Sequence, residues 1–455
     1  MFKSVNPATG KEIATYPELT KDEVENRLGK ASAAYDSWRK TDIRERTELL
    51  LKIADEYEKN KERLARMATE EMGKTLASAI AEVEKCAALF RHYAKEGPAM
   101  LEPECWHLAS GGIAEARWLP QGPVLAVMPW NYPYWQAVRF LAPTILAGNV
   151  ALLKHASIVQ GVAGLMEDMM RDAGAPEGLF QNLGVKSDAV ADIIADDRVV
   201  AVTLTGSEGA GQAVAKQAGH HLKKVVLELG GSDPFIVMPS ADLDKAVKHA
   251  VKGRTQNTGQ SCICAKRMII HTEVYDDFMG RFTEAMKAVK AGDPMADSTD
   301  MGPLSSAGQR DTVLDQLEQA QKNGAKLLFG GERLDGEGAY LTAGVLTDID
   351  PAGPVASEEI FGPIAMVFRA KDIDDAVHLA NNIPFGLGSS VWTSDKAEQE
   401  RFIRDIEAGM TAVNQMLASA PEAPFGGIKR SGHGRELARF GLREFMNLKT
   451  VMLPE

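Results

Sequence analysis

The chain has 455 residues, of which 45% are hydrophobic and 25% charged, an ordinary balance for a globular protein. Its 51 Lys and Arg against 63 Asp and Glu give a formal net charge of -12, which argues against nucleic acid as a partner. No apolar run approaches the ~18 residues of a membrane helix, and the first residues lack the apolar region of a secretory signal. With only four cysteines, the chain is not a disulfide scaffold, and we expect a cytoplasmic protein.

Two segments near the start of the chain, Thr20–Lys40 and Asp42–Lys74, have the periodicity of amphipathic helices. Thr20 followed three residues later by Glu23 is the pattern of a capping box, which predicts that the first helix begins directly after Thr20. Because the polar positions of both segments are dense in Glu and Lys, we expect those faces to contact solvent.

The next part of the chain alternates short apolar runs with helical patterns. Strands are predicted at residues 122–130, 149–157, 198–207 and 223–231, with helices at 161–174 and 209–223. Nearly continuous runs of Val, Leu and Ala suit strands buried on both faces, and helices between such strands imply βαβ units. The pattern therefore predicts an α/β domain with a parallel sheet.

A second α/β pattern follows, and we place the boundary between the two near Gly230–Gly231. Its predicted strands are 232–238, 266–275 and 325–331, and its predicted helices are 243–257, 276–290, 310–324 and 372–383. The last segment, 445–453, is rich in β-forming residues. We expect it to pair with another element or another subunit, because an open strand edge is prone to pairing.

Several polar or reactive side chains lie at predicted strand ends or turns. Cys262 follows a helical pattern, Glu228 ends an apolar run before two glycines, and Asn131 follows another run. Ser207 begins a helix after a strand, where free N–H groups could hold a phosphate. Taken singly, each fits a structural role such as a buried thiol, a surface carboxylate or a turn. Cys262 and Cys264 lack a second cysteine pair, and no HExxH motif occurs, which argues against a metal site.

Seven motifs occur in one order between Pro129 and Glu436, and they resemble the motif series of the aldehyde dehydrogenase superfamily. They are PWNYP, LLKHAS, LTGSEGAG, LELGG, NTGQSC, EEIFGPI and PFGGIKRSGHGRE. The resemblance implies a Rossmann-like cofactor domain, an α/β catalytic domain and a small β oligomerisation element, assembled as a homodimer or homotetramer. The cofactor domain would span 1–101 and 121–230 with 431–445, the catalytic domain 231–430, and the oligomerisation element 102–120 with 446–455.

The resemblance also implies oxidation of an aldehyde to a carboxylate with reduction of a nicotinamide cofactor. Cys262 would be the nucleophile that forms a thiohemiacetal and then a thioester, and we expect its pKa of ~8.5 to need only modest lowering. The Asn131 amide and the Cys262 backbone N–H would stabilise the oxyanion. Glu228, whose pKa we expect apolar neighbours to raise, would activate the hydrolytic water. Whether Glu228 also deprotonates Cys262 is left open.

The cofactor residues are also implied by the resemblance. They are Trp130, Lys154, Ser157, Gly206, Ser207, Leu229, Gly230, Glu359 and Phe361. Lys154 would contact the adenosine ribose, and members that prefer NAD often carry a glutamate three residues later, where this chain has Ser157. A serine does not repel a 2′-phosphate, and Lys154 adds positive charge, so NADP is predicted to be preferred with NAD also accepted. The alternative is that Ser157 has no effect on the cofactor preference and that both cofactors work.

Within the superfamily, the chain resembles the succinate-semialdehyde dehydrogenase group. Arg139 and Ser419 match residues that bind the distal carboxylate of the substrate, whereas Gln256 stands where some members have an arginine. The alternative for Arg139 is an ion pair on a helix surface. Other substrates, such as glutarate semialdehyde or an aliphatic aldehyde, stay open. A non-catalytic protein that retains the fold is a further alternative, although it would need none of the three catalytic side chains.

Cys264 lies two residues after the candidate nucleophile. A pair of cysteines at this spacing can come within disulfide range if the loop bends. Some relatives of the succinate-semialdehyde group use such a pair as a reversible redox switch, and the resemblance extends that hypothesis to Cys262 and Cys264. The alternative is that Cys264 only fills a small space in the core.

Overall fold

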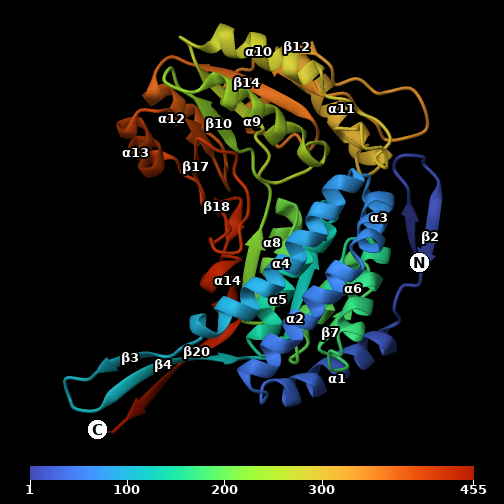
Figure 1. The fold of residues 1–455 in the computed structure, drawn as a ribbon, viewed down its shortest axis with the longest axis vertical. Coiled ribbons are helices and arrows are strands. Elements are labelled where there is room, and N and C mark those ends of the chain that lie inside the picture. Colours follow the sequence, from blue (N-terminus) through green and yellow to red (C-terminus); the bar gives the residue numbers. More distant parts are fainter. Residues whose placement is uncertain (455) are drawn as a thin grey trace.

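The computed structural model describes residues 1–454, which form two α/β lobes and a thin β-arm that projects from one of them (Figure 1). Each lobe is built on a mostly parallel sheet, and the arm is a three-stranded antiparallel sheet. The predicted α/β fold class is therefore confirmed. A hairpin of β1 (Phe2–Val5) and β2 (Glu12–Tyr16) opens the chain, and its turn reaches the second lobe, where Ala339 N donates to Pro7 O at 2.8 Å.

The first lobe contains a six-stranded sheet. Its strands are β5 (Pro123–Met128), β6 (Val150–His155), β7 (Phe180–Asn182), β8 (Ala201–Thr205), β9 (Lys224–Glu228) and β19 (Gly432–His433). The spatial order is β19-β9-β8-β5-β6-β7, and all pairs are parallel except the edge pair of β19 with β9. The strand order reverses between β5 and β8, and ligands of open α/β sheets bind at such a reversal, outside the carboxyl ends of the strands.

Helices cover the sheet of the first lobe. They are α1 (Lys21–Trp38), α2 (Ile43–Lys59), α3 (Lys61–Met72), α4 (Leu76–Met100), α5 (Pro133–Leu146), α6 (Gln160–Asp172), η1 (Ser187–Ala189), α7 (Val190–Ala195), α8 (Glu208–His220) and α14 (Ala438–Arg443). The capping box predicted at Thr20 is present, with Glu23 N donating to Thr20 Oγ1 at 3.3 Å. The segment expected as one helix from Asp42 to Lys74 forms two, because Asn60 leaves helical geometry and its side chain donates to Glu56 O.

Two of these helices, α4 and α5, form the part of the first lobe that faces the second one. Every residue of α5 is buried, so the free N–H groups at its start need acceptors inside the protein. Glu82 of α4 supplies them, because its Oε1 accepts from Tyr134 N and Trp135 N, each at 2.9 Å. Lys74 pairs with the same buried carboxylate and balances its charge. This capping interaction fixes α5 against α4.

The second lobe contains a seven-stranded sheet in the order β12-β13-β14-β11-β10-β16-β17. Its strands are β10 (Pro234–Val237), β11 (Arg267–His271), β12 (Lys326–Phe329), β13 (Gly344–Thr347), β14 (Ile364–Ala370), β16 (Ser390–Trp392) and β17 (Ala412–Val413). All pairs are parallel except β12 with β13, and apolar clusters fill both faces of the sheet. The strand predicted at 266–275 ends early, because Tyr275 already begins a helix.

The remaining elements complete the second lobe. Its helices are α9 (Leu243–Thr255), η2 (Gln256–Gly259), α10 (Tyr275–Lys287), α11 (Ala307–Lys322), η3 (Pro354–Ser357), α12 (Ile373–Asn381) and α13 (Lys396–Asp405). A two-stranded sheet of β15 (Phe385–Gly386) and β18 (Ile428–Lys429) lies outside the main sheet. None of the helices formed by residues 1–454 has both the length and the apolar character that crossing a bilayer requires.

The arm consists of β3 (Glu104–His107), β4 (Ile113–Pro120) and β20 (Met446–Leu453). β20 pairs antiparallel with β4 along its full length, from Met446 opposite Pro120 to Leu453 opposite Ile113. The terminal segment thus pairs with another element, as predicted. Large apolar side chains of the arm are exposed, among them Trp106, Leu448 and Met452. The domain boundaries and the role of the arm in oligomerisation stay predictions.

Candidate active site

Cys262 lies on a strained loop between α9 and β11. Asn257 and Thr258 have positive φ angles of 51° and 55°, and Gly259 follows at 73°. A side chain at Gly259 is impossible, because its Cβ would lie 2.3 Å from Gly362 O. Arg254 holds the loop in place, since its Nη2 donates to Gly259 O and to Gly362 O, both at 2.7 Å. The unusual backbone therefore directs the chain from the end of α9 to the thiol.

Asn131 is brought against the Cys262 loop, as the sequence predicted for a shared site. Its Nδ2 donates to Gln260 O at 3.1 Å, and Asn257 Nδ2 donates to Asn131 O at 2.8 Å. The Asn131 side chain is buried, and one of its two amide N–H groups is not used by Gln260. The Asn131 amide therefore lies against the Cys262 loop with one N–H group to spare, and its role toward an oxyanion stays a prediction.

Lys266 ties the nucleophile loop to the loop before β14, and sequence reasoning missed it. Its Nζ donates to Cys262 O at 2.6 Å and to Ser261 O at 2.8 Å, and it pairs with Glu359 at 3.0 Å. Lys266 therefore connects the candidate nucleophile Cys262 with Glu359, a candidate cofactor residue. The lysine lies four residues after Cys262, but no sequence signal shows that its side chain folds back onto the loop.

The Cys262 thiol is not pre-activated by its surroundings. Burial raises the pKa of Cys262 to about 12, and the opposing charges of Arg139 and Lys266 offset only part of that effect. The expectation that the thiol pKa needs only modest lowering is therefore wrong for this structure. A thiol with such a pKa stays protonated at neutral pH, so its attack on a carbonyl requires a base.

Glu228 is a carboxylate without a partner inside the protein. It ends β9, is 2% exposed, and neither carboxylate oxygen has a hydrogen-bond partner among residues 1–454. Burial raises its pKa well above the usual value, and the negative charge of Glu436 raises it further. Space for the side chain exists because residue 426 is a glycine, where a Cβ would lie 2.6 Å from Glu228 Oε1. The surface-carboxylate alternative for Glu228 is therefore excluded.

Arg139 is buried on α5 and already has a counter-ion. Its Nη2 lies 2.6 Å from Glu436 Oε2, and its guanidinium lies 4.4 Å from the centre of the Phe425 ring. Both charged side chains are nearly inaccessible, so the pair is internal and differs from the surface ion pair considered as the alternative. Arg139 also lines the cavity described next, but most of its charge is balanced by Glu436.

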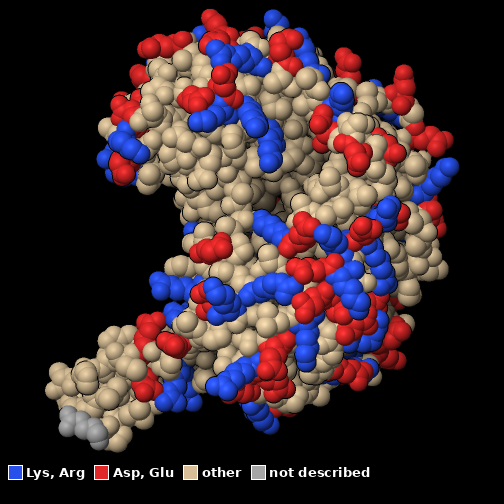
Figure 2. All heavy atoms as spheres, in the orientation of Figure 1, with Lys and Arg blue, Asp and Glu red and all other residues tan. Residues whose placement is uncertain are grey.

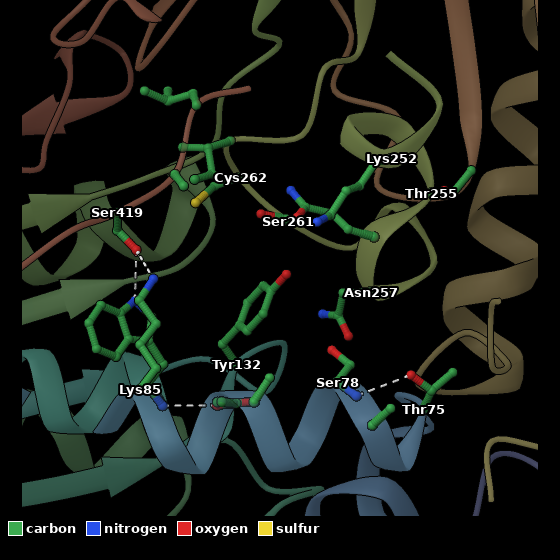
Figure 3. Close-up of a pocket in the computed structure, with 18 of the residues that line it drawn as sticks. Thr75, Ser78, Lys85, Tyr132, Lys252, Thr255, Asn257, Ser261, Cys262 and Ser419 are labelled. Carbon is green, nitrogen blue, oxygen red and sulfur yellow. Dashed lines mark hydrogen bonds between the residues drawn. The ribbon is translucent and has the colours of Figure 1, made fainter. Parts of the chain in front are cut away.

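A cavity of about 860 Å³ opens between the lobes and reaches the Cys262 sulfur (Figure 3). The sequence-predicted residues Gln256 and Ser419 line it together with Arg139. Lys85 of α4 also lines the cavity, and no sequence pattern singled it out. Its Nζ donates to Ser419 Oγ at 2.8 Å. The face shown in Figure 2 is hollowed between the lobes, with basic and acidic side chains interspersed around the opening.

The cofactor candidates gather at the carboxyl ends of the strands in the first lobe. Lys154 lies at the end of β6, where burial lowers its pKa, and it has no ion pair among residues 1–454. Ser157 is exposed just beyond it. Ser207 caps α8, and Gly206 N donates to Glu228 O at 3.0 Å. A Cβ added at Gly209, in the first turn of α8, would meet nothing within 4 Å, so a phosphate can approach the helix start.

The loop before β14 closes the other side of this crevice. The rings of Trp130 and Phe361 meet edge to face, with centroids 5.8 Å apart. Glu359 approaches the turn after β9 so closely that a Cβ on Gly230 would lie 2.2 Å from its Oε2. Gly231 N donates to Glu359 Oε1 at 3.2 Å. The glycines after β9 therefore make room for a side chain of the protein.

Two further predictions concern smaller features of the site. Leu229 packs against α8, where a Cβ on Gly211 would lie 2.7 Å from the leucine side chain, so its side chain contacts the helix next to the crevice.

Cys264 is a free, buried thiol that faces Gln256 O at 3.9 Å. Among residues 1–454, no three His, Cys, Asp or Glu side chains are grouped so that they could hold a metal ion. The redox role of Cys264 stays a prediction.

A crevice at the ends of parallel strands beside a half-buried thiol is the arrangement expected of a dinucleotide-dependent oxidoreductase, and comparisons with known proteins identify the family. The model of the aldehyde dehydrogenase family matches residues 1–451. Succinate-semialdehyde dehydrogenase (NADP+) 1 of Mycobacterium tuberculosis is 51% identical over 452 residues, which cover 99% of both chains. The crystal structure of succinic semialdehyde dehydrogenase from Streptococcus pyogenes in complex with NADP+ superimposes with a TM-score of 0.98, at 37% identity, over 100% of both chains. The chain therefore belongs to the aldehyde dehydrogenase family, as its motifs predicted.

Proposed function

We propose that this aldehyde dehydrogenase oxidises succinate semialdehyde to succinate, with NADP as the preferred cofactor and NAD as a second one. The observation that carries the proposal is the position of Cys262, between a cavity lined by basic side chains and a crevice at the strand ends. The names of the relatives from Mycobacterium tuberculosis and, at 51% identity over 453 residues, from Mycobacterium avium support this substrate and cofactor.

The first chemical step is attack of the Cys262 sulfur on the aldehyde carbon. The new S–C bond pushes the carbonyl electron pair onto oxygen, and the Asn131 amide and the Cys262 backbone N–H donate to this oxyanion. Because burial raises the thiol pKa to about 12, a base has to take its proton. Glu228 fits that role, since its carboxylate is buried, unpartnered and raised in pKa by burial.

The second half of the reaction releases the product. A nicotinamide cofactor held at the strand ends by residues such as Lys154 and Ser207 would supply the hydride acceptor, and loss of hydride from the thiohemiacetal carbon leaves a thioester on Cys262. After Glu228 has released the thiol proton to solvent, it takes a proton from water as the water oxygen attacks the thioester carbon, and the Cys262 thiolate leaves with the electron pair of the S–C bond. The product is a carboxylate, so succinate semialdehyde becomes a dianion that the cavity has to release.

The cofactor preference is proposed from the end of β6. Lys154 is buried there without an ion pair, and Ser157 presents a hydroxyl to solvent next to it. A cation and a hydroxyl donor suit the 2′-phosphate of NADP, whereas nothing at this position binds ribose hydroxyls through a carboxylate. The NADP+ complex of the Streptococcus pyogenes relative supports the same preference.

The decisive experiment is reduced-cofactor formation from succinate semialdehyde, with NADP and NAD compared in the wild type and in Cys262→Ala. We expect faster turnover with NADP and a loss of about 10⁴-fold or more in the variant. Activity with uncharged aldehydes alone would reject the semialdehyde and keep the chemistry. Absence of activity with every aldehyde in a panel of semialdehydes and aliphatic aldehydes would reject the function altogether.

The assembly and the domain assignment are part of the same proposal. We propose a cofactor domain of residues 1–101 and 121–230 with 431–445, a catalytic domain of 231–430, and an arm that joins subunits into a homodimer or homotetramer. Exposed apolar side chains on the arm, such as Leu448, support the assembly. Sedimentation of the wild type and of Leu448→Glu tests it, with dissociation expected in the variant. The four free thiols suit a reducing cytoplasm.

A further inference from the structure

Lys85 places an uncompensated positive charge inside the substrate cavity. The side chain rises from α4 toward Ser419, on the side of the cavity where the Cys262 sulfur lies (Figure 3). It crosses the face of the Trp135 indole, with Nζ 4.1 Å from the ring centroid. No carboxylate among residues 1–454 forms an ion pair with it, and Glu82, which lines the same cavity, is already paired with Lys74.

The other basic residues of the cavity differ from Lys85. Arg139 already has a counter-ion in Glu436, as described above. Lys248 and Lys252 are exposed at the rim, where water solvates their ammonium groups. Lys85 is half-buried, and this partial burial followed by the charge of Arg139 lowers its pKa to about 8. A partly desolvated ammonium without a counter-ion is unfavourable, and an anionic ligand would offset that cost.

The hydrogen bonds of Ser419 show which group the cavity is ready to bind. Its Oγ accepts from Lys85 Nζ at 2.8 Å and from Trp135 Nε1 at 3.1 Å. A hydroxyl has two acceptor lone pairs and one donor hydrogen, so both lone pairs are occupied and only the hydrogen remains. Ser419 can therefore only donate to a ligand. The ammonium of Lys85 likewise has only donors to offer, and a carboxylate accepts from both.

We propose that Lys85 binds the distal carboxylate of the aldehyde substrate, with the Ser419 hydroxyl as the second donor, and that Lys85 determines the preference for semialdehydes over uncharged aldehydes. This inference rests on the proposed function. It assigns the positive charge that binds the distal carboxylate to Lys85 of α4. Arg139 then mainly balances the carboxylates of Glu436 and Glu228.

The test compares Lys85→Met, Lys85→Arg and Lys95→Met with two substrates of equal chain length, succinate semialdehyde and butanal. Methionine keeps the apolar stem over Trp135, and Lys95 is an exposed lysine of the same helix. We expect Lys85→Met to raise KM for succinate semialdehyde by about 10- to 100-fold, the effect of losing a charged hydrogen bond, with KM for butanal changed less than about 3-fold. Lys85→Arg should recover most of the loss, and Lys95→Met should behave as the wild type.

A pH profile tests the charge of Lys85, because the profile would not depend on this residue if it only packed against its neighbours. Only the protonated amine binds a carboxylate, so kcat/KM for succinate semialdehyde in the wild type should fall as pH rises through about 8, the pKa of Lys85. In Lys85→Arg, that fall should disappear below pH 10, and with butanal it should be absent from both enzymes.

Several outcomes would overturn the inference. An unchanged KM for succinate semialdehyde in Lys85→Met, or an equal rise for butanal, would show that Lys85 does not bind the carboxylate. An equal rise in Lys252→Met would show that the overall field of the cavity attracts the substrate, without a local site at Lys85. Failure of the proposed function looks different, because the wild type itself would then fail to oxidise succinate semialdehyde.

Discussion

The two sides of Cys262 are built in different ways. On the cofactor side, the candidate residues follow strands of one parallel sheet, and backbone amides, a helix start and close glycine contacts shape the crevice. On the substrate side, the cavity lies among α4, α5, α9 and loops, and buried charges dominate it. Close backbone and glycine contacts thus shape the first side, where charge acts at the end of β6 near Lys154 and Ser157, whereas buried ion pairs dominate the second side.

Glu228 is the proposed base and ends β9, and its substitution should have the largest effect. Glu228→Gln removes the base and keeps the shape of the side chain, so kcat should fall by about 10²–10⁴-fold in steady-state assays. Rapid mixing distinguishes the two proposed roles of Glu228. A burst of one reduced cofactor per site would place the defect in thioester hydrolysis, and its absence would place the defect in activation of Cys262. A kcat within threefold of the wild type would contradict both roles.

The raised pKa of Glu228 gives the pH dependence a definite sign. Only the ionised carboxylate acts as a base, so kcat should increase as pH rises through the raised pKa. Glu436→Gln removes a negative neighbour that raises this pKa, and it frees Arg139, whose charge lowers it. The rising part of the profile should therefore shift to lower pH in this variant. A shift in the opposite direction would show that Glu436 does not act on Glu228.

Arg139→Met tests the charge balance on the substrate side. The substitution leaves Glu436 buried without its partner, which should lower the free energy of unfolding by about 3–5 kcal/mol in urea titrations. The double variant Arg139→Met with Glu436→Gln should recover part of that loss, because both charges are then removed. Unchanged unfolding together with a raised KM for succinate semialdehyde would instead identify Arg139 as the main ligand of the substrate.

On the cofactor side, Ser157→Glu should have a smaller and selective effect. A carboxylate at this exposed position would repel the 2′-phosphate, so KM for NADP should rise by about tenfold or more, equivalent to about 1.4 kcal/mol. KM for NAD should stay within about threefold or decrease, because the new carboxylate can accept from the ribose hydroxyls. An equal rise for both cofactors would mean that residue 157 affects the site only through its size.

The smallest effect is expected from Cys264→Ala, because the residue is small and buried outside the cavity. Its kcat should stay within about twofold of the wild type. Peroxide inactivation should be reversed by dithiothreitol in the wild type and become irreversible in the variant, if Cys264 traps oxidised Cys262 as a disulfide. Identical inactivation and rescue in both proteins would reject the redox switch.

The strand-end part of the site could be predicted because chain order alone determines it. Four parallel strands deliver Asn131, Lys154, Ser207 and Glu228 to one edge of a sheet, and each follows a recognisable apolar run. The capping box at Thr20 is equally local, since both of its partners lie within four residues. Local patterns of this kind depend only on residues that are close in the sequence, so they can be predicted without knowing the fold.

The charge pairs could not be predicted, because their members are distant in sequence. Arg139 meets Glu436 across almost 300 positions, and Lys85 meets Ser419 across 334. Lys85 looks like any lysine on an amphipathic helix until α5 and the loop before Phe425 close around it. The expected ease of ionising Cys262 failed for the same reason, because the burial that raises its pKa comes from both lobes.

The contact between Gly230 and Glu359 limits how related sequences can diverge. A Cβ at residue 230 would lie 2.2 Å from Glu359 Oε2, so any larger residue there requires the Glu359 side chain to move away from the turn. Glu359 also neutralises Lys266, which holds the carbonyl of Cys262. A substitution in the turn after β9 would therefore displace Glu359 and, through it, Lys266, which holds the nucleophile loop. Evolution of a new cofactor preference is easier at the open position 157, where a substitution meets only solvent.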